Sequence, residues 1–165
     1  MNRTIRLIHK AFILASAAVL FASLVFYLIK WNSLPEKAGV HFGPDCQFDV
    51  YGSKFYGFYP HLVGAAFTAG SALAVRLAGR LKTGLRIDES GERLIKNELC
   101  ITLDVIMFLQ AAFFTHWSLC VSLQQPLNQI IAGNIALVIF GVGLAGFIVQ
   151  TATYFIKKKD KTSAP

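Results

Sequence analysis

The sequence has few charged residues, few prolines and few cysteines, and each shortage argues against a class of protein. Only 15% of its 165 residues are charged, against about 25% in typical soluble domains, so an ordinary soluble fold is disfavoured. A chain with 5 prolines and 14 phenylalanines is too apolar to be a disordered linker. Its 3 cysteines include no Cys-x-x-Cys pair, which argues against a disulfide scaffold and against a zinc ribbon.

Apolar residues make up 55% of the chain and gather in four long runs, at about residues 11–29, 55–75, 99–123 and 130–156. Each run is long enough to cross a bilayer, and in hydrocarbon a helix satisfies its own backbone hydrogen bonds. Buried helices of a soluble bundle would show polar faces, which these runs lack. We therefore predict an all-α integral membrane protein: a single four-span domain over residues 1–165, with its helices in one four-helix bundle.

The distribution of Lys and Arg predicts the orientation of the chain. Thirteen of them lie before residue 11, between 76 and 98, and after 156, whereas 3 lie in segment 30–54. Cytoplasmic flanks carry the excess of positive charge, so we expect both termini in the cytoplasm. The net charge of +7 then indicates lipid headgroups, and not nucleic acid, as the partner of the basic residues. Aromatic residues predict a belt at the outer interface: Tyr27, Trp31, Tyr51, Phe55, Tyr56, Phe58 and Tyr59.

The first run has the basic start of a signal peptide, but no small-x-small cleavage site follows it. We expect it to remain as an uncleaved anchor.

Small and polar residues predict how the helices pack. The second run carries a stripe of small residues at intervals of four, which lets backbones approach and also permits a homodimer: Ala66, Gly70, Ala74 and Ala78. One face of the third run carries a polar and small seam: Asp104, Ala111, Thr115, Ser118 and Ser122. We expect this seam to face the bundle interior. The six-residue connection between the third and fourth runs predicts that these helices are antiparallel neighbours.

Four intramembrane polar residues are candidates for function: His61, Asp104, His116 and Gln150. A membrane-embedded acid is costly, so Asp104 is either a structural clasp, within reach of Arg76, or a cation- or proton-binding group. His61 and His116 would need further ligands to hold a metal, so no metal site is predicted. No catalytic triad, phosphate loop or His-Glu-x-x-His motif is present, so no catalytic residue and no cofactor are predicted.

Segment 30–54, between the first two runs, is the most distinctive part of the sequence. It is too short to fold alone and must rest on the helix ends. Closely spaced turn formers predict a fixed, irregular extracytoplasmic cap on the first two helices: Pro35, Gly39, Gly43, Pro44 and Gly52. Four residues could ligate a cation or equally make the hydrogen bonds that hold the cap: His41, Asp45, Cys46 and Asp49. A bridge between Cys46 and Cys120 is geometrically conceivable.

This segment also carries a motif. Leu-Pro is followed by His-Phe, by Asp-x-Tyr-Gly-Ser-Lys and by a later Pro, at Leu34, Pro35, His41, Phe42, Asp49, Tyr51, Gly52, Ser53, Lys54 and Pro60. The motif resembles a bacterial membrane domain of unknown function, which forms the N-terminal part of the sporulation-delay toxin-immunity (SdpI-like) proteins and also occurs alone. The resemblance covers about residues 10–75. The sequence departs from the family at Gly39, Cys46 and Phe48, where the family usually has Pro, Gly and Pro.

The resemblance implies a multi-pass protein of the bacterial cytoplasmic membrane, with toxin-immunity and signalling proteins among its relatives. Two hypotheses follow. In the first, a non-enzymatic membrane protein recognises a peptide or protein partner through its outer loop. In the second, a small transporter or cation-binding protein uses Asp104 or the outer histidines.

Overall fold

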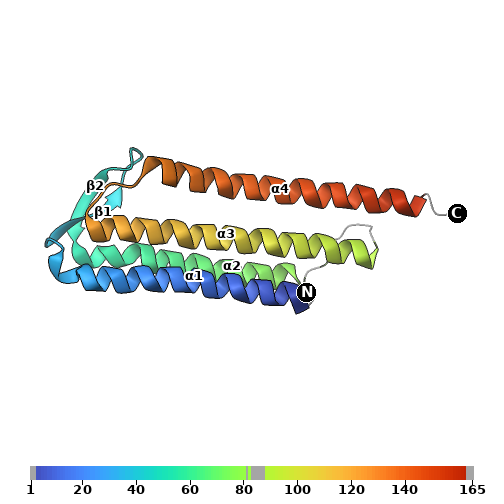
Figure 1. Cartoon of the computed structure of the whole chain (residues 1–165), viewed down its shortest axis with the longest axis horizontal. Coiled ribbons are helices and arrows are strands. Elements are labelled where there is room, and N and C mark those ends of the chain that lie inside the picture. The colour runs from blue at the N-terminus through green and yellow to red at the C-terminus, as the bar shows by residue number, and fades with distance from the viewer. Residues whose placement is uncertain (1–2, 81, 83–87, 163–165) are drawn as a thin grey trace.

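Four long helices make up most of the fold (Figure 1). The computed structural model describes residues 3–80, 82 and 88–162. Within these ranges the helices are α1 (Arg3–Lys30), α2 (Tyr59–Ala78), α3 (Glu89–Leu123) and α4 (Gln129–Thr162). Successive helices reverse direction, so the start of α1, the start of α3 and the end of α4 lie at the same end of the molecule (Figure 1). Consequently α1 and α3 run parallel to each other.

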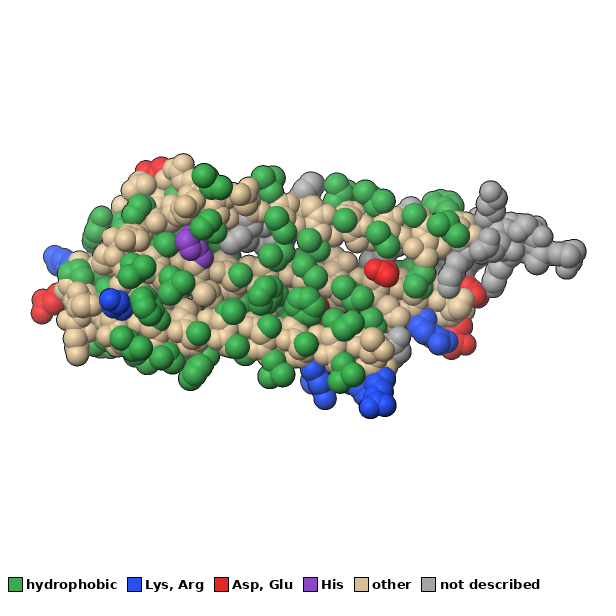
Figure 2. All heavy atoms as spheres, viewed as in Figure 1, with side chains coloured by type: hydrophobic (Ala, Val, Ile, Leu, Met, Phe, Trp, Pro, Cys, Tyr) green, Lys and Arg blue, Asp and Glu red, His purple; other side chains and the backbone are tan. Residues whose placement is uncertain are grey.

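Many large apolar side chains of these long helices lie on the outside of the molecule. Three helical segments among the described residues are long and apolar enough to cross a membrane: Arg3–Ser33, Lys54–Ala78 and Glu89–Leu123. Large apolar side chains point outward from them, as exposed as Leu14 at 70% and Leu62 at 68%. Figure 2 shows hydrophobic side chains along the molecule and charged ones toward its two ends. Such a surface fits lipid and indicates a mostly helical membrane protein. A fourth span in α4, and a closed four-helix bundle, remain predictions.

The helix α3 begins well before the apolar run that predicts it. Asp88 caps its N-terminus by accepting a hydrogen bond from the Gly91 N–H at 3.1 Å. Two ion pairs at a spacing of four follow in the first turns, Arg93–Glu89 at 3.6 Å and Lys96–Glu92 at 3.1 Å. Part of the connection predicted between the second and third spans is therefore a polar extension of α3.

The segment between α1 and α2 is not the irregular cap that its turn formers predict. It contains an antiparallel hairpin of β1 (Lys37–Phe42) and β2 (Phe48–Ser53), flanked by two 3-10 helices, η1 (Trp31–Ser33) and η2 (Lys54–Phe58). The strands hold valine and aromatic residues, which favour extended backbone, and several turn formers lie at the hairpin tip. Register shifts on both sides of His41 interrupt the ladder. The all-α prediction thus holds for the long helices and is wrong for this loop.

Buried apolar residues form one cluster near each end of the helices. The cluster at the hairpin end, called the outer cluster, joins the hairpin to the helix ends and contains Tyr27, Leu34, Phe42, Cys120, Val121 and Leu127. The inner cluster contains Ile5, Val75 and Cys100. Between the clusters, buried positions of α1 and α3 include serine, alanine, histidine and aspartate. The prediction that the polar seam of α3 faces the interior is confirmed at Asp104, Ala111, Ser118 and Ser122.

The small-residue stripe of α2 packs against the inner cluster at one of its four positions, Ala78. Ala66, Gly70 and Ala74 are exposed, and among the described residues no atom beyond the adjoining turns of α2 lies within 4 Å of where a Gly70 Cβ would be. They line an open groove of about 520 Å³ between α2 and α3. The close approach of α2 occurs at Gly64, where an added Cβ would lie 2.8 Å from Leu20. Phe67 and Phe114 stack beside the groove, with ring centroids 5.8 Å apart, and these large rings occupy the α2–α3 contact instead.

Candidate functional site

A glutamine at the end of α3 holds the hairpin to the helices. Gln124 ends α3 in the left-handed conformation, with φ of 51°. Its Oε1 accepts a hydrogen bond from the Gly39 N–H at 2.8 Å, and its Nε2 donates to the Gly39 carbonyl at 3.3 Å. The same Nε2 donates to the Val121 carbonyl at 2.7 Å. The side-chain amide therefore pairs with β1 as a neighbouring strand would, and it fixes β1 to α3.

The connection between α3 and α4 holds the tip of the hairpin. The Leu127 N–H donates to the Cys46 carbonyl at 2.9 Å, and Gln129 Nε2 donates to the Asp45 carbonyl at 2.8 Å. Cys46 has a φ of 63°, so the tip turns through the left-handed region there. The cap thus rests on α3 and on the start of α4, and not only on α1 and α2 as predicted. The polar run Gln124–Gln129 was the available signal, because it places several amide side chains between two apolar runs.

A buried tyrosine fixes the other end of the cap. Tyr27 is fully buried, and its hydroxyl donates to the Lys54 carbonyl. Lys54 Nζ donates to the Trp31 carbonyl at 3.2 Å and lies 4.7 Å from the centroid of the Trp31 ring. Gly57 leaves the space that the Tyr27 ring occupies, because a Cβ there would overlap it. Tyr27 is therefore a core residue, which corrects its prediction as part of the interfacial belt. Tyr51, Phe55, Tyr56 and Tyr59 are exposed, and their place in an interfacial belt stays a prediction.

Several residues of the family-like motif form the underside of the cap. Leu34, Phe42 and Pro60 are buried. Gly52 lies against the Tyr56 ring, since a Cβ added at Gly52 would lie 3.1 Å from a ring carbon. The Ser53 hydroxyl accepts a hydrogen bond from the Phe55 N–H at 3.4 Å. With Lys54, these residues hold the hairpin on the helix ends.

The remaining motif residues face outward. His41 Nδ1 and Asp49 Oδ1 lie 2.7 Å apart, with side chains 53% and 44% exposed. Tyr51 is 64% exposed, and Pro35 is exposed as well. The structure thus brings the motif together in one cap, with a polar pair and a tyrosine available to a partner.

The second candidate site is the buried polar seam between α1 and α3. Buried residues of the two helices fall at positions separated by 95, beginning with the bonded pair His9 and Asp104. The others are Ile5 and Cys100, Ser16 and Ala111, Ser23 and Ser118, and Tyr27 and Ser122. Two parallel helices with equal rise keep such a register along their whole contact. Their side chains are mostly small, which permits close backbone approach in lipid.

Asp104 is paired with a histidine near the inner end of this seam. Asp104 Oδ1 lies 2.6 Å from His9 Nδ1, and both side chains are buried. Arg76, which the sequence placed within reach of Asp104, is exposed, and the partner of Asp104 is His9 instead. Sequence reasoning missed His9 because it precedes the apolar run, although a parallel α1 brings it level with Asp104. His9 Nε2 and Asp104 Oδ2 have no hydrogen-bond partner among the described residues.

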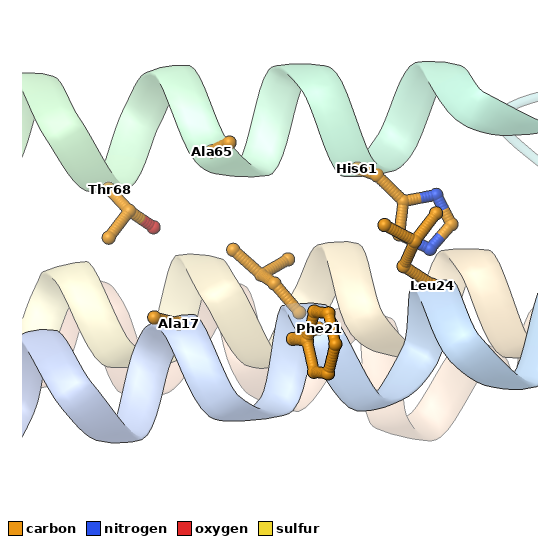
Figure 3. Close-up of a pocket in the computed structure, with 7 residues that line it drawn as sticks. Ala17, Phe21, Leu24, His61, Ala65 and Thr68 are labelled. Atoms are coloured by element: carbon orange, nitrogen blue, oxygen red, sulfur yellow. The ribbon is translucent and has the colours of Figure 1, made fainter.

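The two outer histidines have separate partners. His61 Nε2 lies 2.8 Å from Ser118 Oγ, and the His116 ring lies 3.8 Å from Cys120 Sγ. His61 is buried at one end of an apolar groove of about 270 Å³ between α1 and α2, with Thr68 toward the other end (Figure 3). Among the described residues no group of three or more His, Cys, Asp or Glu could hold a metal. The side chain of Gln150 lies outside the described part of the chain.

The cysteines are free. Cys46 and Cys120 both contact the outer cluster, but Cys46, Cys100 and Cys120 form no disulfide. The bridge that the sequence allowed is therefore absent from this structure.

Comparison with known proteins finds no matching family model, no matching curated protein and no matching solved structure.

Proposed function

We propose that this chain is a non-enzymatic, multi-pass protein of a bacterial cytoplasmic membrane that recognises a peptide or protein partner through its outer cap. One observation carries the proposal: the residues of the resembled motif converge on a single anchored cap that leaves His41, Asp49 and Tyr51 exposed. A cap held in place by helix ends binds without a large ordering cost, which is the property a recognition surface needs.

The conformation of the cap supports the resemblance to the toxin-immunity family. Cys46 occupies a position where the family usually has Gly, and its φ of 63° is one that Gly adopts most readily. Gly39 replaces a Pro of the family, and its N–H makes the bond to Gln124 that a proline could not make. The conformation at Cys46 favours a turn shared with the family. The bond from Gly39 is an attachment to α3 that the family, with its proline, would lack.

The arrangement of the ends supports the proposed topology. The start of α1 and the end of α4 lie at the same end of the molecule and the hairpin lies at the other (Figure 1). The sequence before residue 11, between 76 and 98, and after 156 carries 13 of the 16 Lys and Arg, which are typical of the cytoplasmic side. The hairpin would then face the outside, where a peptide partner would meet it.

The test is a deletion strain challenged with a panel of membrane-active peptides and complemented with cap variants. We expect deletion to raise sensitivity to at least one peptide and His41→Ala to complement poorly. The matched control is Gln47→Ala, an exposed residue of the same hairpin. Unchanged sensitivity across the panel contradicts an immunity role. Full complementation by His41→Ala contradicts a role for the His41–Asp49 pair.

The second candidate is a small transporter or cation-binding protein, favoured by the buried His9–Asp104 pair. A carboxyl and an imidazole in contact inside a membrane can exchange a proton between them, and each retains one unpartnered polar atom. Asp104→Asn keeps the shape of the side chain and removes its charge. If that variant folds normally and leaves proton and cation flux into vesicles unchanged, this candidate fails.

A further inference from the structure

The two edges of the hairpin differ in their hydrogen-bond partners. On the β1 edge, both main-chain groups of Gly39 bond to the Gln124 side chain. Gly39 pairs across the ladder with Tyr51, and this is therefore a non-hydrogen-bonded pair. In such a pair the main-chain groups of both residues point away from each other's strand. The N–H and C=O of Tyr51 consequently face the outer edge of β2, as do those of Ser53 two residues on.

The outer edge of β2 is open. Among the described residues the sheet has two strands, so no further strand pairs with β2. Val50 is 50% exposed and Tyr51 is 64% exposed, on opposite faces of the strand. Exposed edges usually carry protection such as lysine, proline or a covering element. Here the β1 edge has its glutamine. On β2 a charge and a register shift lie at Asp49, toward the tip, whereas Val50, Tyr51 and Gly52 after it carry no charge.

The edge also points in a defined direction. Counted from the end of α3, the order across the sheet is β1 and then β2, because Gln124 bonds β1 on the side opposite to β2, and the hairpin lies beyond the helix ends (Figure 1). A strand added to β2 would therefore extend the sheet away from the helical body. A second copy in the same membrane lies beside the helices, not beyond their ends, so an incoming segment of another polypeptide fits this edge better.

We propose that the outer edge of β2 docks an extended segment of a partner polypeptide, which adds to the hairpin as a third strand. This inference rests on the proposed function, since the segment would belong to the partner that the cap recognises. Main-chain hydrogen bonds at Tyr51 and Ser53 would supply the affinity for the segment. Contacts with the Val50 and Tyr51 side chains would supply the sequence specificity. Because segment 30–54 carries three Lys and three acidic residues, the fitting partner is an apolar segment without strong charge.

The experiment uses the full-length protein in lipid nanodiscs and a library of linear eight-residue peptides without charged residues. Peptides that bind are synthesised with a single N-methyl group at each position in turn. We expect N-methylation at alternate positions to weaken binding about tenfold or more, because only every second N–H pairs with β2. The intervening positions should tolerate the methyl group.

Two variants test the edge itself. Tyr51→Pro removes the outward N–H at a position where an edge strand accepts proline, and it should weaken binding of the same peptides about tenfold. Tyr51→Phe keeps the main chain and should bind as the wild type does. If Tyr51→Pro lowers the melting temperature, the inference is decided by the N-methylated peptides alone, because they are tested on the wild-type protein.

Three outcomes would overturn the inference: absence of any binding peptide, binding that tolerates N-methylation at every position, or a disulfide-linked dimer through Tyr51→Cys that shows a second copy on the edge. The proposed function is tested separately by the peptide challenge of the deletion strain. A cap that matters for resistance while β2 binds no strand would leave that function standing without this docking mode.

Discussion

Single side chains hold this molecule together where hydrocarbon offers them no other partner. His9 and Asp104 each remove much of the cost of burying the other, at a separation of 2.6 Å. At the outer end, the Tyr27 hydroxyl satisfies the Lys54 carbonyl and the Tyr27 ring fills the space beside Gly57. These contacts join α1 to α3 and α1 to the cap, so substitutions at them should have effects well beyond their own size.

Replacing Asp104 by Ala should destabilise the protein by about 3–5 kcal/mol, because it leaves His9 buried without its partner. The double variant His9→Ala with Asp104→Ala should cost less than the sum of the two single changes. Thermal unfolding in detergent or nanodiscs measures all three, with exposed Glu89→Ala as the control. Strict additivity would show that the two side chains are not coupled.

Gly57→Ala should destabilise the cap, because the added Cβ would overlap the buried Tyr27 ring. A cost of about 1–3 kcal/mol is typical of such overpacking. Gly70→Ala is the matched control: within the described part of the chain no atom beyond the adjoining turns of α2 lies within 4 Å of its Cβ position, and alanine in a helix is favoured over glycine by about 0.5–1 kcal/mol. Melting temperatures should move in opposite directions, and a shared direction would contradict the packing at Gly57.

At the scale of the elements, the hairpin and the parallel pair of α1 and α3 organise the molecule. The hairpin is a two-stranded sheet, which is marginal in isolation, and the end of α3 supplies what it lacks. The α1–α3 pair keeps one register from Ile5 and Cys100 to Tyr27 and Ser122. Each element therefore depends on a neighbour that is distant in sequence.

Gln124→Ala should release β1 from α3, because it removes the hydrogen bonds to Gly39. We expect amide hydrogen exchange across β1 and β2 to accelerate about thirtyfold, as two bonds of about 1 kcal/mol each are lost. Gln125→Ala is the control, since that exposed residue contributes through its backbone N–H to Cys120. Equal exchange in the two variants would show that Gln124 does not anchor the hairpin.

At the scale of the whole molecule, the distribution of apolar and charged side chains over the surface suits a membrane environment. Apolar side chains cover the long helices, charged residues lie toward the ends, and the hairpin stands opposite the termini (Figures 1 and 2). The exposed groove along α2 and the glycines of α4 that face open space leave lateral surface for lipid.

The topology predicts which positions react from which side. In a variant with Cys46, Cys100 and Cys120 replaced by Ser, a cysteine at Ser53 should react with a membrane-impermeant maleimide on intact spheroplasts. A cysteine at Ser90, at the start of α3, should react only after the membrane is opened. Both positions are exposed, so access and not burial decides the outcome. Labelling of both from the same side would contradict the predicted orientation.

Much of the candidate site follows from local sequence, and the rest does not. The motif from Leu34 to Pro60 marks the cap, and the period of Asp104, Ala111 and Ser118 marks the inward face of α3, because helical spacing is a local property. The hairpin escaped prediction because turn formers and short strands mix within it, and strand pairing depends on non-local contacts. The sequence predicts Tyr27 as an interfacial aromatic residue. It is a core residue instead, because Gly57 has no side chain in the space that the Tyr27 ring occupies.

What the sequence by itself determined is the membrane character, the helices and the face of α3 that turns inward. These depend on apolar runs and on residue spacing along one chain. Only the tertiary structure decided the partners: His9 for Asp104, Gln124 for Gly39, and an open edge on β2. The physical reason is that hydrogen bonds across 85 or 95 residues depend on how parallel helices align and where they end, which no local pattern encodes.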